Sequence, residues 1–251
     1  MDERTLTKLL GRVKKGDVSV GEAVRALKDL PFAELGFATV DTHRALRMGF
    51  PEVILGQWKT TEHCAGIIGA LAVRKQSVLV TRLQAEKAAA LLELFPKAKW
   101  HPQARILSLH SGRKPRAGKV VVVCAGTSDI PVAEEAAVTA ECFGATVHRI
   151  NDVGVAGIHR LLKRRHEMDD AHAIVCVAGM EGALASAVGG LVGVPVVAVP
   201  TSIGYGVSEH GFTALLAMMA SCASNVSVVN IDNGFKAGFY AALISRTRGR
   251  R

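Results

Sequence analysis

The stretch KVVVVCAGTSDIPVAEEAAVTAECFG, residues 119–144, decides the fold of this chain. It opens with a continuous apolar run, which is typical of a strand covered on both faces of a parallel sheet. A glycine and two hydroxyl residues follow, and then a helical pattern in which Ser128 or Asp129 can cap the first turn and Pro131 fits within it. The stretch therefore predicts a strand that leads directly into a helix.

The same order of strand and helix repeats toward the C-terminus. Further strands are predicted at residues 145–152, 172–180, 195–203 and 225–232, each before a helical pattern. Connections that return through a helix place successive strands parallel in one sheet. We therefore expect an α/β domain over residues 119–245, with any ligand at the carboxyl ends of its strands, and a basic tail at residues 246–251.

The N-terminal half has a different organisation. Two amphipathic helical patterns within residues 1–35 predict a helical arm that docks on a neighbouring surface. Residues 36–112 alternate short strands and helices, which predicts a smaller α/β domain. Residues 113–118, RKPRAG, combine charge with proline and glycine, so we expect the linker between the two domains there.

The composition excludes several classes of protein. The 251 residues are 49% apolar, and no apolar run reaches the ~18 residues that span a bilayer. Met1 is followed by Asp2 and Glu3, not by a basic and then apolar leader, so we expect a cytoplasmic protein without a membrane partner. The net charge of +9 includes four arginines near the C-terminus, and only two Trp and two Tyr are available for base stacking. We therefore expect small phosphorylated ligands and no nucleic acid.

The cysteines indicate neither a disulfide framework nor zinc. There are five, without a CxxC pair, and the nine histidines show no HExxH spacing. Cys124 and Cys176 lie inside apolar runs and are expected in the core. Cys222 lies where the helical pattern of residues 211–219 meets the last strand. A core position is the commoner fate of a cysteine, but partial exposure there would permit a reactive thiolate.

Three predicted strand ends are expected to converge on Cys222. Residues 125–129 place hydroxyls at a helix start, where N–H groups bind phosphate, although a capped helix without a ligand explains them equally well. Residues 178–190 combine glycines with Glu181, whose carboxylate can handle protons or simply stabilise the helix dipole. Residues 200–211 form a glycine-rich loop that can close over a ligand. The substrate-binding candidates at these and neighbouring strand ends are Gly126, Thr127, Ser128, Asp129, Asp152, Gly179, Met180, Gly204 and Asn233.

The smaller domain supplies a second group of binding candidates. Asp41, Arg44 and Lys59 bracket two of its strand ends. Arg44 and Lys59 can clamp a phosphate or a carboxylate, and ordinary surface cations would have the same spacing. No tight ligand cluster accompanies them, so no metal site is expected.

Several long motifs resemble one family, the LarB proteins of nickel-pincer cofactor biosynthesis. The first domain carries DTHRALRMGFPEVILGQWKT, residues 41–60. The second carries AGTSDIPVAEEA, NDVGVAGIHRLL, VAGMEGALASAVGGLV, PVVAVPTSIGYG and SCASNVSVVNIDNGF, in this order. The second domain also resembles, more distantly, the aminoimidazole ribonucleotide carboxylase PurE. That resemblance implies a flavodoxin-like three-layer fold and a homo-oligomer, in PurE an octamer.

The LarB resemblance implies an activity. Nicotinic acid adenine dinucleotide would be carboxylated on its pyridinium ring by carbon dioxide, and its phosphoanhydride hydrolysed, giving pyridinium-3,5-biscarboxylic acid mononucleotide and AMP. The resemblance assigns the ring-attacking thiol to Cys222 and a catalytic carboxylate to Glu181. No tightly bound cofactor is expected, and Mg²⁺ could assist the phosphoanhydride step.

Two residues depart from the family pattern. Asn225 and Lys236 stand where glycines are expected. Asn tolerates left-handed backbone angles, so Asn225 is interpreted as a replacement for glycine at such a position.

The alternative functions are an aminoimidazole ribonucleotide carboxylase of purine biosynthesis and a nucleotide-binding module without chemistry.

Overall fold

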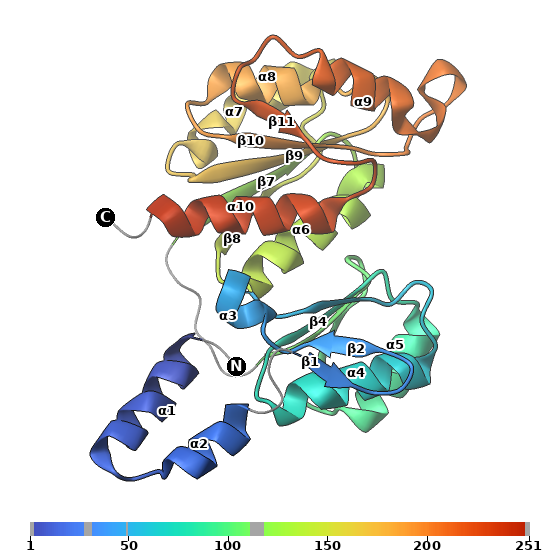
Figure 1. The fold of residues 1–251 in the computed structure, drawn as a ribbon. Coiled ribbons are helices and arrows are strands. Elements are labelled where there is room, and N and C mark those ends of the chain that lie inside the picture. The colour runs from blue at the N-terminus through green and yellow to red at the C-terminus, as the bar shows by residue number, and fades with distance from the viewer. Residues whose placement is uncertain (1–2, 28–31, 49, 111–117, 249–251) are drawn as a thin grey trace. The chain divides into compact units, whose positions relative to one another are not determined.

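The computed structural model describes residues 3–27, 32–48, 50–110 and 118–248 (Figure 1). The chain divides into two compact units: unit 1 contains residues 1–100 and 106–113, and unit 2 contains residues 101–105 and 114–251. Residues 113–117 of the predicted linker lie outside the described residues. In the described ranges, no helix is long and apolar enough to cross a bilayer.

Unit 2 is built on one parallel five-stranded sheet, as the repeated order of strand and helix predicts. Its strands lie in the spatial order β11-β10-β9-β7-β8, and each neighbouring pair is parallel. Their bounds are β7 (Lys119–Cys124), β8 (Thr146–Ile150), β9 (Ala173–Ala178), β10 (Val196–Pro200) and β11 (Val226–Val228). The central strand β9 is buried along its whole length, which explains its uninterrupted apolar sequence.

Helices cover both faces of this sheet, giving the predicted three-layer α/β fold (Figure 1). One face carries α6 (Ile130–Cys142) and α10 (Gly234–Arg248), and the other carries α7 (Ile158–Lys163), α8 (Leu184–Leu191) and α9 (Phe212–Met219). Helices α6 and α10 pack closely because Gly234 and Gly238 have no side chain. A Cβ atom at Gly238 would lie 2.2 Å from the carbonyl oxygen of Ala136.

Short 3-10 segments follow several strands of unit 2. They are η1 (Thr127–Asp129), η2 (Val155–Gly157), η3 (Arg165–Met168) and η4 (Gly206–Gly211). Cys124 and Cys176 are fully buried, which confirms the expectation that they are core residues. Helix α10 continues through Arg248, so the predicted tail begins as helix, and residues 249–251 lie outside the described residues.

Unit 1 is a smaller α/β unit with a helical arm before it. The arm consists of α1 (Glu3–Lys15) and α2 (Val20–Leu27), with Ser19 and Glu22 forming the predicted capping box. Next come β1 (Phe32–Glu34), β2 (Thr39–Asp41), α3 (Arg44–Met48), β3 (Val53–Leu55), α4 (Thr61–Val73), β4 (Val78–Thr81), α5 (Ala85–Leu94), β5 (Lys99–His101) and β6 (Ile106–Leu109).

The strands of unit 1 form two sheets. β1 and β2 make an antiparallel pair, and the larger sheet has the order β3-β4-β6-β5. Three short elements, β1, α3 and β5, were not predicted from the sequence. Strand β1 also lies within residues 1–35, so the predicted arm is not entirely helical. Elements of three to five residues carry too little periodicity to be distinguished from loops.

Candidate active site

Asp129 is a buried hydrogen-bond acceptor at the carboxyl edge of the unit 2 sheet. Its side chain is only 4% exposed, and it accepts hydrogen bonds from the backbone N–H of Gly126 at 2.9 Å and the hydroxyl of Thr201 at 2.7 Å. The backbone N–H of Gly179 donates to it as well. Burial raises the pKa of Asp129, although these donors act in the opposite direction. Asp129 therefore ties together the loops after β7, β9 and β10.

Two of the three glycines predicted at this edge, Gly179 and Gly204, are required by the protein's own backbone, whereas a Cβ atom at Gly126 would meet its nearest neighbour only at 3.7 Å. A Cβ atom at Gly179 would lie 2.3 Å from the carbonyl oxygen of Ile203, and one at Gly204 would lie 2.4 Å from that of Ser208. The backbone N–H of Met180 donates to Ile203 at 2.9 Å. Gly179 thus allows the loops after β9 and β10 to approach closely, and Gly204 allows the loop after β10 to fold tightly on itself.

Unusual backbone angles gather at the same edge. Asp152, Met180 and Asp232, which follow β8, β9 and β11, have φ of 58°, 52° and 54°. Non-glycine residues in this region cost roughly 1–2 kcal/mol each, and such conformations cluster at functional sites. The side chain of Asp152 pairs with Arg160 at 2.6 Å, and that of Asp232 accepts from the backbone N–H of Ser202 at 2.8 Å.

The exposed candidates stand around this framework. Thr127 and Ser128 are exposed in η1, Glu181 is exposed in the turn after β9, and Asn233 is half-buried before α10. Asn233 accepts from the backbone N–H of Lys236 at 2.9 Å and so caps that helix. The structure therefore brings the candidates of unit 2, except Cys222, to one edge of the sheet.

Cys124 also reaches the carboxyl edge but has a different character. Its thiol donates to the side-chain oxygen of Asn151 at 3.4 Å. Burial raises the pKa of Cys124 to about 11, so this thiol stays protonated at neutral pH. Cys124 is consequently a hydrogen-bond donor within the core and a poor nucleophile.

Cys222 lies at the amino edge of the sheet, opposite the carboxyl ends of the strands. The prediction that three strand ends converge on Cys222 is therefore wrong for a single chain. Val226, the first residue of β11, is in register with Val196, the first residue of β10. The loop before Val226 therefore lies at the amino edge, where Asn225 accepts from the backbone N–H of Val196 at 2.9 Å. Cys222 is nevertheless exposed, whereas Cys64, Cys124 and Cys176 are buried and Cys142 is half-buried.

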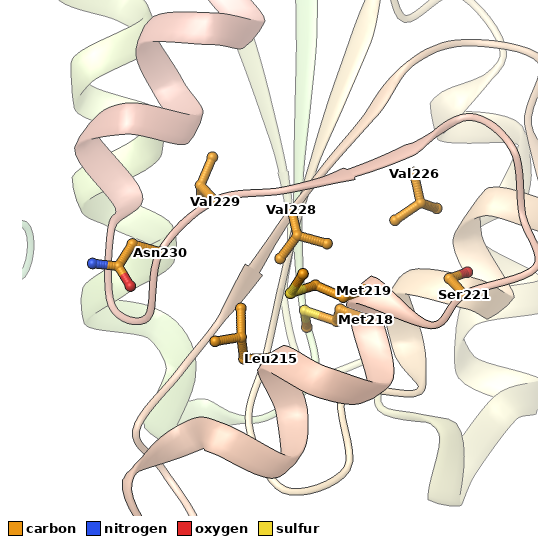
Figure 2. Close-up of a pocket in the computed structure, with 8 residues that line it drawn as sticks. All are labelled: Leu215, Met218, Met219, Ser221, Val226, Val228, Val229 and Asn230. Atoms are coloured by element: carbon orange, nitrogen blue, oxygen red, sulfur yellow. The ribbon is translucent and has the colours of Figure 1, made fainter.

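A groove of about 400 Å³ runs beside the Cys222 loop, between α9 and β11 (Figure 2). Its exposed lining is about equally polar and apolar and is formed by Leu215, Met218, Met219, Ser221, Val226, Val228, Val229 and Asn230. Ser221, next to Cys222, marks one end of the groove and Asn230 the other. Such a lining can contact the face of a ring and polar groups at its edge, and it offers no cation for a phosphate.

Of the three candidates of unit 1, Asp41, Arg44 and Lys59, only Lys59 lines a smaller cavity. Asp41 forms an ion pair with Arg47 at 2.7 Å and accepts from the backbone N–H of His43 at 3.1 Å. Burial acts to raise the pKa of Asp41, but the hydrogen bond and charge of Arg47 outweigh it, and the net pKa is lowered. Asp41 is thus held as a carboxylate that positions Arg47.

Lys59 and Glu52 both line this cavity, whose volume is about 120 Å³. Glu52 was not anticipated from the sequence, and its carboxylate accepts from the backbone N–H of Asp41 at 2.7 Å. Arg44 is the first residue of α3. Among the described residues, no group of three or more His, Cys, Asp or Glu side chains is placed to hold a metal ion.

Comparisons with known proteins follow the division into two units. Residues 32–111 match the family described as the LarB/PurE-like N-terminal domain, and residues 119–250 match the AIR carboxylase family. An uncharacterized protein of Methanocaldococcus jannaschii is 38% identical over 259 aligned positions, which cover 97% of this chain and 98% of that protein.

Two solved structures from Treponema denticola resemble part of this chain. The crystal structure of PurE is 19% identical and covers 53% of this chain and 91% of its own, with a TM-score of 0.38. That of a PurE2 variant is 18% identical and covers 54% and 91%, with a TM-score of 0.39.

Proposed function

Because this chain belongs to the LarB family, whose second domain is of the AIR carboxylase type, we propose that it carboxylates the pyridinium ring of nicotinic acid adenine dinucleotide. In the same proposal it hydrolyses the phosphoanhydride of that dinucleotide. The products are pyridinium-3,5-biscarboxylic acid mononucleotide, a precursor of the nickel-pincer nucleotide, and AMP.

The observation that carries this proposal is that Cys222 is exposed and directly follows Ser221, which lines the groove between α9 and β11. A pyridinium ring is electron-poor and cannot attack carbon dioxide. Addition of a thiolate to the ring carbon beside the reacting one supplies an electron pair and yields an enamine-like ring. That carbon then forms a bond to carbon dioxide.

A base completes the carboxylation, and we assign this role to Glu181. Loss of the ring proton to a carboxylate restores aromaticity, and the carbon–sulfur bond breaks to release the thiolate. Glu181 is exposed at the turn after β9 and can accept a proton there. Water then cleaves the phosphoanhydride and releases AMP.

The proposal requires a second copy of the chain. Glu181 follows the end of β9, beside Pro200, and Cys222 lies near Val196, so the length of β10 separates them. Four steps of a strand span about 13 Å, whereas both groups must reach adjacent ring atoms at about 3–3.5 Å. We therefore propose that Cys222 of one subunit acts with Glu181 of another.

Exposed apolar side chains support self-association, and the octamer of PurE is the assembly that we propose. Between 62% and 92% of the side chain is exposed at Tyr205, which precedes η4, at Val207 on η4, and at Phe212, Leu216 and Met219 on α9. A cluster of this kind on a soluble domain usually marks an interface.

The pyrophosphate of the substrate needs cations, and unit 2 offers few near its carboxyl edge. Arg160 is already paired with Asp152 there. We assign phosphate or carboxylate recognition either to Lys59 and Arg44 of unit 1 or to the loop of unit 2 that carries Thr127 and Ser128. We propose no tightly bound cofactor, and Mg²⁺ would arrive on the phosphates of the substrate.

Mass analysis of the products tests this proposal. The chain is incubated with nicotinic acid adenine dinucleotide and ¹³C-bicarbonate, and we expect AMP and a mononucleotide that carries the label. Parallel reactions contain aminoimidazole ribonucleotide. Label in that product alone would identify a purine-type carboxylase, and binding of the dinucleotide without any turnover would identify a nucleotide-binding module.

A further inference from the structure

The loop that carries Cys222 is fastened to α8 at both of its ends. Residues 220–225 join the end of α9 to the start of β11. At the first end, the hydroxyls of Ser221 and Ser186 share a hydrogen bond of 2.8 Å. The oxygen of Ser221 also accepts from the backbone N–H of Ala223 at 3.3 Å. The residues on both sides of Cys222 are therefore held in place.

At the second end, the side-chain amide of Asn225 caps the C-terminus of α8. Its nitrogen donates to the carbonyl oxygens of Gly189 at 3.2 Å, Val192 at 3.0 Å and Val194 at 3.0 Å. The last carbonyls of a helix have no partner within the helix and carry its partial negative charge. Asn225 thus satisfies, from another element, a carbonyl in the last turn of α8, that of its C-cap residue and one just beyond the helix.

Close packing supports the same arrangement. A Cβ atom at Gly189 would lie 2.8 Å from the Cβ atom of Ala223 and 3.2 Å from the side-chain oxygen of Asn225. The absence of a side chain at Gly189 therefore allows the loop to rest directly on α8.

The backbone angle does not explain why an asparagine stands at this position. Asn225 is not among the described residues with positive φ, so its interpretation as a tolerant substitute for a left-handed glycine is wrong. A glycine at position 225 would have no side-chain amide and could make none of the three contacts. The side chain of Asn225, and not its backbone, is what this chain uses.

We propose that Asn225 is a positioning residue for Cys222: by capping α8 it fixes the loop of residues 220–225, so that the thiol is presented in one orientation. This inference rests on the proposed function of Cys222. Thiolate addition to a flat ring requires the sulfur above one carbon atom, and a misplacement of about 1 Å can cost about 10²-fold in rate. Since Cys222 itself is exposed, its orientation depends on the fixed residues beside it.

Two variants and one control test the inference in the full-length chain. Asn225→Ala removes the amide, and Ser186→Ala removes the contact at the other end of the loop. Ser227→Ala is the matched control, because Ser227 is exposed on β11 two residues from Asn225. Three quantities are measured: amide hydrogen exchange of residues 220–225, alkylation of Cys222 by iodoacetamide, and kcat and KM with the dinucleotide and bicarbonate.

We expect Asn225→Ala to speed exchange of the loop about tenfold and to lower kcat about tenfold, with KM changed less than about threefold. Alkylation of Cys222 should stay within about threefold of the wild-type rate, since a small reagent does not require one orientation of an exposed thiol. Ser186→Ala should show a weaker form of the same pattern, and Ser227→Ala should leave all three quantities unchanged. If Asn225 had only a structural role, its loss would lower the melting temperature, and it would not lower kcat while leaving the alkylation rate of Cys222 near that of wild type.

Each contrary outcome has a distinct meaning. Wild-type kcat in Asn225→Ala, or unchanged exchange of the loop, would overturn the inference. If Asn225→Ala does not fold, the decision passes to Ser186→Ala, and an unaltered kcat with faster exchange would overturn the inference there. If the wild-type chain forms no product, the proposed function fails instead, and loop exchange still shows whether Asn225 fixes residues 220–225.

Discussion

The two edges of the unit 2 sheet are constructed in different ways. At the carboxyl edge, the buried carboxylate of Asp129 collects donors from three loops, and Asp152, Met180 and Asp232 adopt positive φ. At the amino edge near β11, an uncharged amide and two hydroxyls hold the Cys222 loop. The carboxyl edge is thus organised by a charge and the amino edge by neutral contacts.

This difference is consistent with the proposal that ligand binding and thiolate attack use different edges of the sheet. Exposed hydroxyls at the start of a helix suit an anionic ligand, whereas an exposed thiol in a loop next to a groove without cations suits an electron-poor ring. One chain carries both surfaces but holds them a strand's length apart. The proposed chemistry therefore depends on which surfaces meet between subunits.

The largest expected effect is the loss of carboxylation in variants of Cys222 and Glu181, and its recovery when the two variants assemble together. Cys222→Ser should abolish carboxylation while binding of the dinucleotide changes by less than about tenfold, or 1.4 kcal/mol. Glu181→Gln should also be nearly inactive, with its fold intact. If each site combines the two residues from different chains, randomly co-assembled variants recover about a quarter of wild-type sites in a symmetric oligomer.

The measurement is turnover by a mixture that has been unfolded and refolded together. The control is the same mixture refolded separately and combined without exchange of subunits. Recovery only in the first mixture supports sites shared between chains. Failure to recover activity in either would mean that Cys222 and Glu181 act within one chain, whereas activity of one variant by itself would mean that its residue is not part of the site.

The second prediction concerns the hydrogen bond between Thr201 and Asp129 at the carboxyl edge. Thr201→Val keeps the shape of the side chain but removes the hydroxyl that donates to Asp129. Loss of a hydrogen bond to a buried charged group should lower the free energy of unfolding by about 2–3 kcal/mol. Urea denaturation measures this change, and Thr201→Ser, which keeps the hydroxyl, is the control. A deficit of equal size in both variants would mean that packing, not hydrogen bonding, is responsible.

The pH dependence of that deficit follows from the raised pKa of Asp129. A carboxyl with a higher pKa in the folded chain binds its proton more tightly there, so its ionisation lowers stability as pH rises above the ordinary value of about 3.9. Thr201→Val removes a donor that lowers this pKa. Its deficit should therefore be larger at pH 7 than at pH 4.

The third prediction concerns the contact between α8 and the Cys222 loop at the amino edge, and it compares two adjacent glycines of α8. A Cβ atom at Gly189 would meet Ala223 and Val226 at 2.8 Å, whereas one at Gly190 would meet nothing within 4 Å. Gly189→Ala should destabilise by about 1–2 kcal/mol through overpacking. Gly190→Ala should be neutral or stabilise by up to about 1 kcal/mol, because alanine favours helix. Urea denaturation of both proteins checks the difference, and equal values would mean that the loop adjusts without cost.

The sequence was sufficient for most of the unit 2 fold. The apolar runs at residues 120–124, 173–178 and 196–199 are buried strands, because parallel strands covered on both faces need continuous apolar sequence. Glycines and prolines mark where these strands end. Unit 1 was predicted less completely, since β1, α3 and β5 are only three to five residues long.

The candidate site was predicted at the level of loops but not of contacts. Residues 125–129 and 178–182 do meet at one edge, as parallel topology requires. The same topology would have placed Cys222 correctly, because a loop that leaves a helix and enters a parallel strand lies at the amino edge. The partners of Thr201 and Asn225 were not predictable, since each bond joins elements far apart in the sequence.

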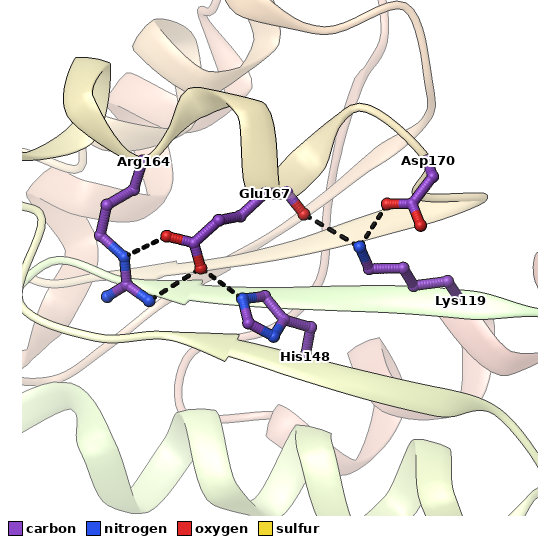
Figure 3. Close-up of polar contacts among 5 residues, drawn as sticks. All are labelled: Lys119, His148, Arg164, Glu167 and Asp170. Atoms are coloured by element: carbon purple, nitrogen blue, oxygen red, sulfur yellow. Dashed lines mark hydrogen bonds and ion pairs between the residues drawn. The ribbon is translucent and has the colours of Figure 1, made fainter.

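At the β8 side of the unit 2 sheet, opposite β11, ion pairs between surface side chains join β7 and β8 to the segment of residues 164–170. Glu167 of η3 accepts hydrogen bonds from Arg164 and contacts His148 of β8, while Lys119 pairs with Asp170 (Figure 3). The hydrogen bond from Arg164, followed by the contact with His148, lowers the pKa of Glu167 to about 2. This part of the sheet should therefore respond to acid in a way that the Cys222 loop does not.

The smallest effect expected is that of Glu167→Gln. A carboxyl whose pKa is lowered in the folded chain stabilises it above the ordinary pKa of about 4.3, and that stabilisation is lost as pH falls toward about 2. Because these side chains are partly exposed and screened by solvent, the loss of stability at pH 7 should be only about 0.5–1 kcal/mol. Urea denaturation at pH 7 and pH 3 should show the deficit shrinking in acid, with Asp169→Asn as the control on the same segment. Hydrogen exchange of residues 220–225 should be the same in Glu167→Gln and wild type, and faster exchange there would show that the two ends of the amino edge are coupled.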